Sequence, residues 1–187
     1  KKLTCPQCLT TKHKNDEITY SHKVLQGAIV HPDIKQVIPL MPEQIVNSDG
    51  ASKQDCEINA SKRWLSKIKQ DHPRLNLIIN ADGLSSKQPF ITAINEVGYN
   101  YIIVAKPDDH KYMMEWVDAF DSIPGKKDVD AKGRIHQYEW VTDVPLNGRE
   151  DAIQVNFFRY RIISINKNGK EKINYRGSWV TDLPLNE

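Results

Sequence analysis

The sequence predicts a mixed α/β fold in which helices flank a sheet, and three observations support this class. Two β-type runs, 18–30 and 36–45, surround a Pro-Asp turn. Between residues 57 and 120, short apolar runs alternate with helical periodicity, the pattern of strand, helix, strand units. Short β-type runs dominate residues 134–181, which predicts an antiparallel β region towards the C-terminus.

The N-terminal part is predicted to contain a hairpin followed by a helix. His31-Pro32-Asp33 joins the first two strands, because proline and aspartate favour turns. Ser52, with Asp55 three residues on, resembles a capping box, so a helix is expected to begin there. Its apolar residues recur at helical spacing until Pro73 ends it: Ala60, Trp64, Leu65 and Ile68.

A strand, helix, strand unit comes next. The apolar run 77–79 is typical of a strand covered on both faces. Pro89 and Gly98 delimit an amphipathic helix, since proline favours the first helical position and glycine the C-terminal stop. Residues 99–105 form a second buried strand, and the unit should make two parallel neighbours through a right-handed crossover.

The remaining chain is predicted to be a helix followed by β-structure. The helix is expected from Asp109 to Phe120, before Pro124-Gly125. Asn168-Gly169 is a strong hairpin signal within the β-structure. We therefore predict two regions, an α/β core over residues 1–125 and an antiparallel β insertion over 126–187. The β-type runs of the second region are 135–141, 153–166 and 172–181.

Composition restricts the class of protein. No apolar run approaches the ~20 residues of a membrane span, and the N-terminus lacks a hydrophobic signal region, so no membrane partner is expected. Three cysteines, two of them in one CxxC, fit a reducing compartment, which predicts a cytoplasmic protein. Because the first residue is Lys1 rather than Met, we expect a piece of a longer protein.

Asp82 is the leading candidate functional residue. The run LIINADGLS, residues 77–85, delivers this carboxylate onto a glycine turn at the end of a strand. In open α/β sheets ligands bind at the carboxyl ends of strands, and carboxylates suit hard divalent cations such as Mg²⁺. A structural role, in which Asp82 only caps the turn, stays open at this point.

Several segments together resemble one protein family. They are HPD at 31–33, VIPLMPEQI at 37–45, KQDCE at 53–57, ADGL at 81–84 and YIIVAKPDDH at 101–110. In this order they resemble a bacterial insertion-sequence transposase with a DDE catalytic domain, over nearly the whole chain. The resemblance implies a ribonuclease H-like fold, that is, a mixed sheet flanked by helices, which in many relatives carries a β insertion.

The chemistry that this resemblance implies is metal-assisted phosphoryl transfer on DNA. Three carboxylates would hold two Mg²⁺ ions roughly 3.5 to 4 Å apart. The second of them falls on Asp82, whereas the first would precede Lys1 and the Glu would follow Glu187. The implied partner is DNA, both transposon ends and target, and a homodimer of the intact protein is left open. The chain alone is expected to be inactive, because one carboxylate cannot organise two ions.

A second candidate is a zinc site formed by Cys5 and Cys8 with His13 and His22. Thiolate and imidazole are the ligands that zinc prefers, and CxxC is the usual first half of a tetrahedral site. His13 is expected to join before His22, because a strand over 18–30 would hold His22 away. The two cysteines would equally suit a small turn with a packed thiol.

Two segments are strongly basic, although the net charge of +2 excludes a uniformly basic coat. Residues 1–14 carry four lysines and no acid, and residues 156–178 carry six Lys or Arg against Glu171 alone. Strand alternation also allows an ordinary strand, with Phe157 inward and the arginines in solvent. The residues predicted to contact DNA are Arg159, Arg161, Lys170 and Lys172.

Two other functions remain open from the residues. One is a zinc-stabilised nucleic-acid-binding module without catalysis. The other is a self-sufficient Mg²⁺ nuclease that uses Asp82 with Asp55 or Glu57, although the helix dipole alone favours acids at those two positions. The scattered histidines are expected at turns or on the surface rather than in a site: His31, His72, His110 and His136.

Overall fold

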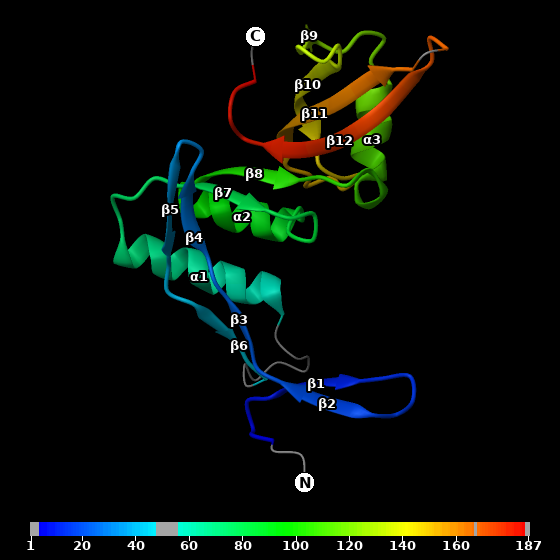
Figure 1. Cartoon of the computed structure of the whole chain (residues 1–187). Coiled ribbons are helices and arrows are strands. Elements are labelled where there is room, and N and C mark those ends of the chain that lie inside the picture. The colour runs from blue at the N-terminus through cyan, green and yellow to red at the C-terminus, as the bar shows by residue number, and fades with distance from the viewer. Residues whose placement is uncertain (1–3, 48–55, 167, 186–187) are drawn as a thin grey trace. The chain divides into compact units, whose positions relative to one another are not determined.

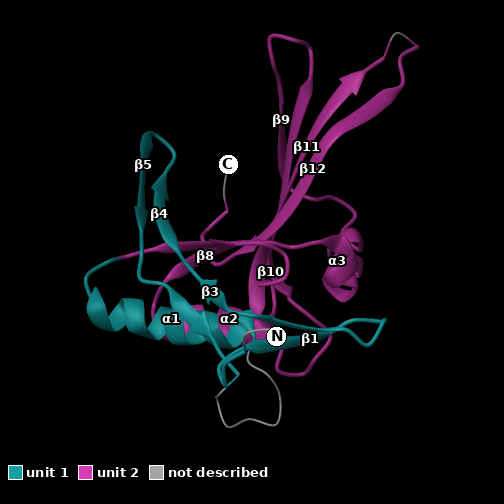
Figure 2. Cartoon of the chain, turned by 60° about the horizontal axis from the view of Figure 1, so that its bottom comes forward, with its two compact units in different colours: residues 1–75 teal, residues 76–187 magenta. Residues whose placement is uncertain are grey.

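The protein is a mixed α/β protein whose chain divides into two compact units (Figure 1, Figure 2). The structure, a computed structural model, describes residues 4–47, 56–166 and 168–185. Unit 1 is Lys1–Leu75 and unit 2 is Asn76–Glu187, and each is described by itself. No helix among the described residues has the length and apolar character needed to cross a membrane.

The described residues of unit 1, 4–47 and 56–75, form three antiparallel strand pairs. The predicted hairpin around His31-Pro32-Asp33 is confirmed, because His31 pairs with Ile34 across the turn. The predicted strand 18–30 is instead three strands, which break at His22 and again before residue 28. The pairs are β1 (Leu9–Lys12) with β2 (Ile18–Ser21), β3 (Lys23–Leu25) with β6 (Glu43–Ile45), and β4 (Ala28–His31) with β5 (Ile34–Pro39).

Helix α1 (Glu57–Asp71) provides the core of unit 1 and confirms the predicted apolar face. The Trp64 indole N–H donates to the carbonyl of Met41 at 2.9 Å. Its ring also lies against Gly27, where a Cβ would come within 2.3 Å of the ring, so the absence of a side chain at Gly27 makes room for the indole. Cys56 is the N-cap and makes no side-chain capping bond. The predicted capping residues Ser52 and Asp55 lie outside the described residues.

Unit 2 is built on one six-stranded mixed sheet, which confirms the predicted class. Its strand order is β7-β8-β12-β11-β10-β9, with β7 and β8 parallel and every other neighbour antiparallel. The strands are β7 (Ile78–Ala81), β8 (Asn100–Val104), β9 (Gly125–Val129), β10 (Ile135–Pro145), β11 (Gln154–Ile165) and β12 (Glu171–Thr181).

The helices of unit 2 follow the predicted order. Helix α2 (Gln88–Glu96) connects β7 to β8, and Gly98 ends this connection with a φ of +72°, as expected for a C-terminal glycine. Asp109 does not cap the next helix as predicted. It belongs to the 3₁₀ turn η1 (Pro107–Asp109), and His110 is the N-cap of α3 (Lys111–Asp118).

The β-rich C-terminal region joins the sheet of the strand, helix, strand unit. Residues 179–181 of β12 pair with residues 102–104 of β8. Strands from both sides of the predicted boundary at residue 125 thus share one sheet. The boundary itself stays a prediction about how the chain is organised. Strand β9 was not predicted, because all five of its residues are exposed and it lacks apolar alternation.

The two faces of this sheet differ in burial. Ile103, Val180 and Phe157 are aligned across β8, β12 and β11, and each is at most 1% exposed. The predicted burial of residues 77–79 on both faces is wrong, because β7 is an edge strand and Ile78 is 55% exposed. A short apolar run cannot by itself distinguish a central strand from an edge strand.

Replacing Phe157 by alanine should destabilise unit 2 strongly. The side chain is 1% exposed, so Phe157→Ala should lower the free energy of unfolding by about 3–5 kcal/mol. Urea denaturation followed by circular dichroism measures this. Ile165→Ala is the matched control, because Ile165 lies on the same strand and is 57% exposed. Equal losses in the two variants would contradict the assignment of Phe157 to the core.

Candidate functional site

Three potential metal ligands converge in unit 1. The Cys5 and Cys8 Sγ atoms are 3.4 Å apart, and the Nε2 atom of His22 lies 3.3 Å from each sulfur. Donor atoms around a tetrahedral zinc ion, at the usual bond lengths, would be about 3.5–3.8 Å apart. Within residues 4–47, 56–166 and 168–185, this is the one group of three or more potential ligands.

Backbone register explains the arrangement. Cys5 and Cys8 form a tight turn, in which the Cys8 N–H donates to the Cys5 carbonyl at 3.1 Å. Strand β1 starts at Leu9, which pairs with Ser21 at the end of β2. Cys8 and His22 are the next residues outward on the two strands, so the antiparallel pairing brings them together.

The predicted preference for His13 over His22 is therefore wrong. His13 adjoins the opposite end of the β1–β2 hairpin, where its Nε2 lies 2.9 Å from the Thr19 hydroxyl oxygen. His22 was expected to be held away by a strand, but the strand ends at Ser21 and places the imidazole beside the cysteines. Strand pairing here assembles the site.

The group can hold a metal ion such as zinc. Two thiolates and one imidazole provide three ligands and leave one tetrahedral position for a further donor. Cys8 is 6% exposed, which shields one side of the group, whereas His22 is exposed. The third cysteine, Cys56, is exposed at the start of α1 and is not part of the group.

Asp82 lies where the sequence places it, directly after β7. Its Oδ1 accepts a hydrogen bond from the Leu84 N–H at 3.0 Å, which makes a tight turn over Gly83. The carboxylate is exposed, and its second oxygen is not used in that turn. The stem of Lys106, which follows β8, packs on Gly83, where a Cβ would meet Lys106 Cγ at 3.0 Å. Residues following both parallel strands thus meet at one edge.

A buried Ser86–His110 pair fixes the loop that carries Asp82. Ser86 Oγ lies 2.7 Å from His110 Nε2 and 2.8 Å from the Gly83 carbonyl, and neither side chain is more than 6% exposed. Burial lowers the pKa of His110, although its hydrogen bond to the backbone of Leu146 acts in the opposite direction. His110 was expected at a turn or on the surface, and it lies in the turn between η1 and α3, where it is buried. Its position between charged residues in the sequence gave no sign of burial.

The arginines predicted to contact DNA are engaged within the sheet. Arg159 Nε and Arg161 Nη2 bind the two oxygens of Glu139 at 2.7 and 2.9 Å. Phe157 is buried as expected, but alternation along β11 places both arginines on its face, so the expectation that the arginines point outward is wrong. Arg159 Nη1 is 3.8 Å from Asp118 of α3.

The other predicted residues are spread over the molecule. Lys170 and Lys172 are exposed at and beside the turn between β11 and β12. Glu57 is in the first turn of α1, where the helix dipole favours an acid. Asp55 lies outside the described residues, so a nuclease site that joins it or Glu57 to Asp82 stays a prediction.

Comparison with protein-family models finds no match for this chain, and a search of curated proteins finds none.

Zinc should be bound through His22 and not through His13. The protein should contain about one zinc per chain, and His22→Ala should weaken zinc binding by more than about 100-fold, because losing even an outer partner of a ligand costs 10–100-fold. Competition with a chromogenic chelator measures the affinity. His13→Ala is the control and should bind zinc like the wild type. An equal loss in the two variants would contradict the proposed ligand set.

Unit 2 should lose stability on mild acidification because of His110. Its folded-state pKa lies below the unfolded value of about 6.5, so its stabilisation is complete above that pH and is lost as the pH falls towards the folded pKa. The melting temperature should therefore fall between pH 7 and pH 5, and less so in His110→Gln. That variant should lose about 1–3 kcal/mol at pH 7, because the buried Ser86 hydroxyl loses one of its two hydrogen-bond partners.

His72→Gln provides the control for this pH dependence, since His72 is exposed at the end of α1. Calorimetric scans at matched ionic strength give the melting temperatures. A slope in His110→Gln identical to that of the wild type would show that His110 does not cause the acid sensitivity.

Proposed function

We propose that this chain is the central part of a DDE transposase catalytic domain, which cuts and joins DNA at insertion-sequence ends with Mg²⁺. The observation that carries the proposal is the position of Asp82. The residue directly follows β7, which is parallel to β8, so it stands at the carboxyl end of a parallel pair. Ligands of open α/β sheets bind at that edge.

The state of the Asp82 side chain is compatible with binding a hard cation. The carboxylate is exposed, and its turn occupies one oxygen, which leaves the other available to a metal ion. Mg²⁺ is usually bound by one or two carboxylates and keeps several waters. Lys106, whose stem packs on Gly83, brings a positive charge to the same edge, where a phosphate would be attracted.

A ribonuclease H-like arrangement is proposed from the order of elements. The chain runs through a hairpin, a helix and a parallel strand, helix, strand unit, and ends in antiparallel strands of the same sheet. This order along the chain agrees with the one implied by the sequence resemblance, although the hairpin β4–β5 forms a two-stranded sheet of its own and does not pair with the six-stranded sheet. Under the proposal, two more carboxylates from outside residues 1–187 complete the site, so the isolated chain has no cleavage activity of its own.

The metal-ligand group of unit 1 supports a second proposed function. Cys5, Cys8 and His22 lie within 3.4 Å of one another, and structural zinc contributes directly to folding. A zinc-stabilised nucleic-acid-binding module would need this group and would not need Asp82. The two proposals are therefore separated by which substitution abolishes function.

The transposase proposal predicts a large loss of activity in Asp82→Asn. In the test, the full reading frame that contains these 187 residues is expressed. The readout is the excision of a marker that is placed between the DNA sequences adjoining this gene on its two sides. Losing a residue that only supports a metal ligand lowers activity by about 10- to 100-fold. Because Asp82 would bind the metal directly, excision should fall by more than about 100-fold. Thermal unfolding should be unchanged, since Asp82 is exposed.

Asp121→Asn is the matched control, because Asp121 is also an exposed aspartate of unit 2. It should excise the marker at the wild-type rate. Wild-type excision by Asp82→Asn would refute the assignment of Asp82 as a metal ligand. Excision that is lost on zinc removal but not in Asp82→Asn would favour the binding module.

A further inference from the structure

One face of the strands β10, β11 and β12 carries a cluster of aromatic rings. We call it the aromatic face: Tyr138, Trp140, Phe158, Tyr160, Tyr175 and Trp179. Register explains the clustering, because Trp140 pairs with Phe158, which pairs with Trp179. Tyr138 pairs with Tyr160 in the next row, and paired residues of antiparallel strands share a face.

The rings lie close enough to form a continuous surface. The ring centroids of Tyr138 and Tyr160 are 5.0 Å apart with planes inclined by 22°, and those of Phe158 and Trp179 are 5.7 Å apart. The Tyr160 and Tyr175 centroids are also 5.7 Å apart. Stacked and tilted pairs at these distances are favourable aromatic contacts.

The aromatic face is not covered as the opposite face is. None of its six residues is buried, and Tyr175 is 45% exposed, whereas Phe157 and Val180 on the opposite face are at most 1% exposed. Gly177 lies between Tyr175 and Trp179, and a Cβ there would meet the Trp179 ring at 2.3 Å. The Trp179 indole therefore lies over Gly177, along the strand, and remains partly exposed.

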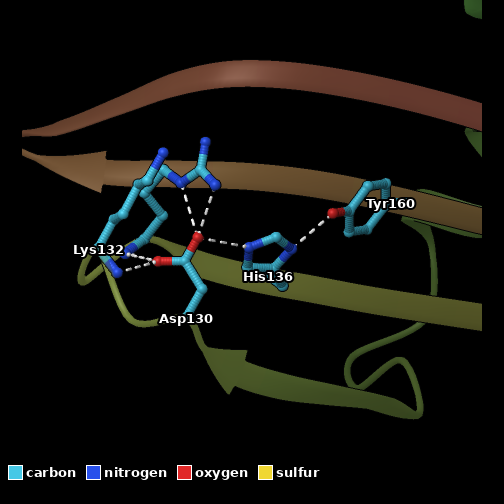
Figure 3. A network of polar contacts seen from close by, with 5 residues as sticks. Asp130, Lys132, His136 and Tyr160 are labelled. Carbon is cyan, nitrogen blue, oxygen red and sulfur yellow. Dashed lines mark hydrogen bonds and ion pairs between the residues drawn. The ribbon is translucent and has the colours of Figure 1, made fainter.

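A polar network fixes the orientation of one ring in this cluster (Figure 3). Asp130 Oδ2 lies 3.2 Å from His136 Nε2, and His136 Nδ1 lies 2.6 Å from the Tyr160 hydroxyl. Hydrogen bonds from the Arg134 backbone and guanidinium hold the pKa of Asp130 well below its usual value, so it stays ionised. Partial burial raises the pKa of Tyr160, so its phenol stays neutral beside an anionic ligand.

Positive charge surrounds the ends of these strands. The segments 126–134 and 168–176 together contain seven Lys or Arg and three Asp or Glu. Lys126 and Lys172 pair with Tyr138 and with Ser164, so both belong to the aromatic face. Lys172 is one of the residues that the sequence predicts to contact DNA, and it forms no ion pair within the described part of the chain.

We propose that the aromatic face binds unpaired bases of single-stranded DNA, with the flanking lysines on the phosphates. Ring faces stack on any base, and basic residues that follow the strand neutralise its backbone. A second copy of this chain is a poorer occupant, because the lysines of the two copies would face each other. A protein interface core is also typically depleted of lysine.

This inference deepens the proposed function, since it names the form of DNA that unit 2 recognises, and it moves the contact surface away from Arg159 and Arg161. It depends on the transposase proposal only for the choice of DNA over RNA. Binding of a single strand does not require Asp82, so Asp82→Asn should bind the strand like the wild type.

The test measures fluorescence anisotropy of a labelled oligothymidine of about 12 nucleotides, within the site sizes of single-strand-binding folds. Trp179→Ala should raise the dissociation constant by about 5- to 150-fold, the effect of losing one stacked base. Trp116→Ala is the matched control, because Trp116 lies on α3 and is 39% exposed. It should bind like the wild type.

Each outcome bears on the proposal. Trp179→Phe keeps an aromatic surface and should restore binding, which separates stacking from a folding defect, and circular dichroism checks the fold of each variant. Absence of binding by the wild type, equal losses in Trp116→Ala, or equal affinity for a duplex would overturn the proposal. Tighter binding of oligouridine would assign RNA instead, and dimerisation that Trp179→Ala abolishes would assign a second copy.

Discussion

The pairing of β12 with β8 is the constraint on which unit 2 depends. Strand β8 is parallel to β7 on one side and antiparallel to β12 on the other, so it joins two kinds of sheet. Side chains reinforce the junction. Ser178 donates its hydroxyl hydrogen to the Ala105 carbonyl and Thr181 to the Tyr101 carbonyl, both at 2.6 Å, and all this backbone is buried from competing water. Strand β12 thereby fixes the position of β8, which pairs with β7, the strand that Asp82 follows.

The junction also decides which polar groups are available for function. It aligns Val180 with Ile103 and Phe157 on the covered face, and that face continues into Arg159, Arg161 and Glu139. Two half-buried guanidiniums bind one carboxylate there, because leaving such charges unpaired would be costly, although the Nε atom of Arg161 is buried without a hydrogen-bond partner. The opposite face receives the rings and Lys172, which forms no ion pair within the described part of the chain, whereas Lys126 of the same face lies 3.7 Å from Asp128.

Local sequence patterns predicted most of the helices and strands, but they did not predict which distant residues pair. Helix α1 and the connection through Gly98 follow from periodicity and from the preference of glycine for positive φ. The faces of β11 were misassigned, although strict alternation puts Phe157 and Arg159 on one side, because arginine was assumed to seek solvent. Glu139 is its buried partner, and no local signal connects residues 139 and 159. Asp82 was placed correctly, since a strand followed by Asp-Gly is a local pattern.

The metal-ligand group shows the same limit and indicates why unit 1 would benefit from a metal. His22 reaches the cysteines only through the pairing of Leu9 with Ser21, which sequence spacing does not reveal. One core cluster of unit 1 joins Leu9, Ile45 and Ala60, and every residue of β5 is exposed. Bound zinc would add its binding free energy to the folding of this unit. An ion held by Cys5, Cys8 and His22 would connect the segment before β1 to the junction of β2 and β3. Leu25, at the end of β3, packs against the cluster of Leu9, Ile45 and Ala60.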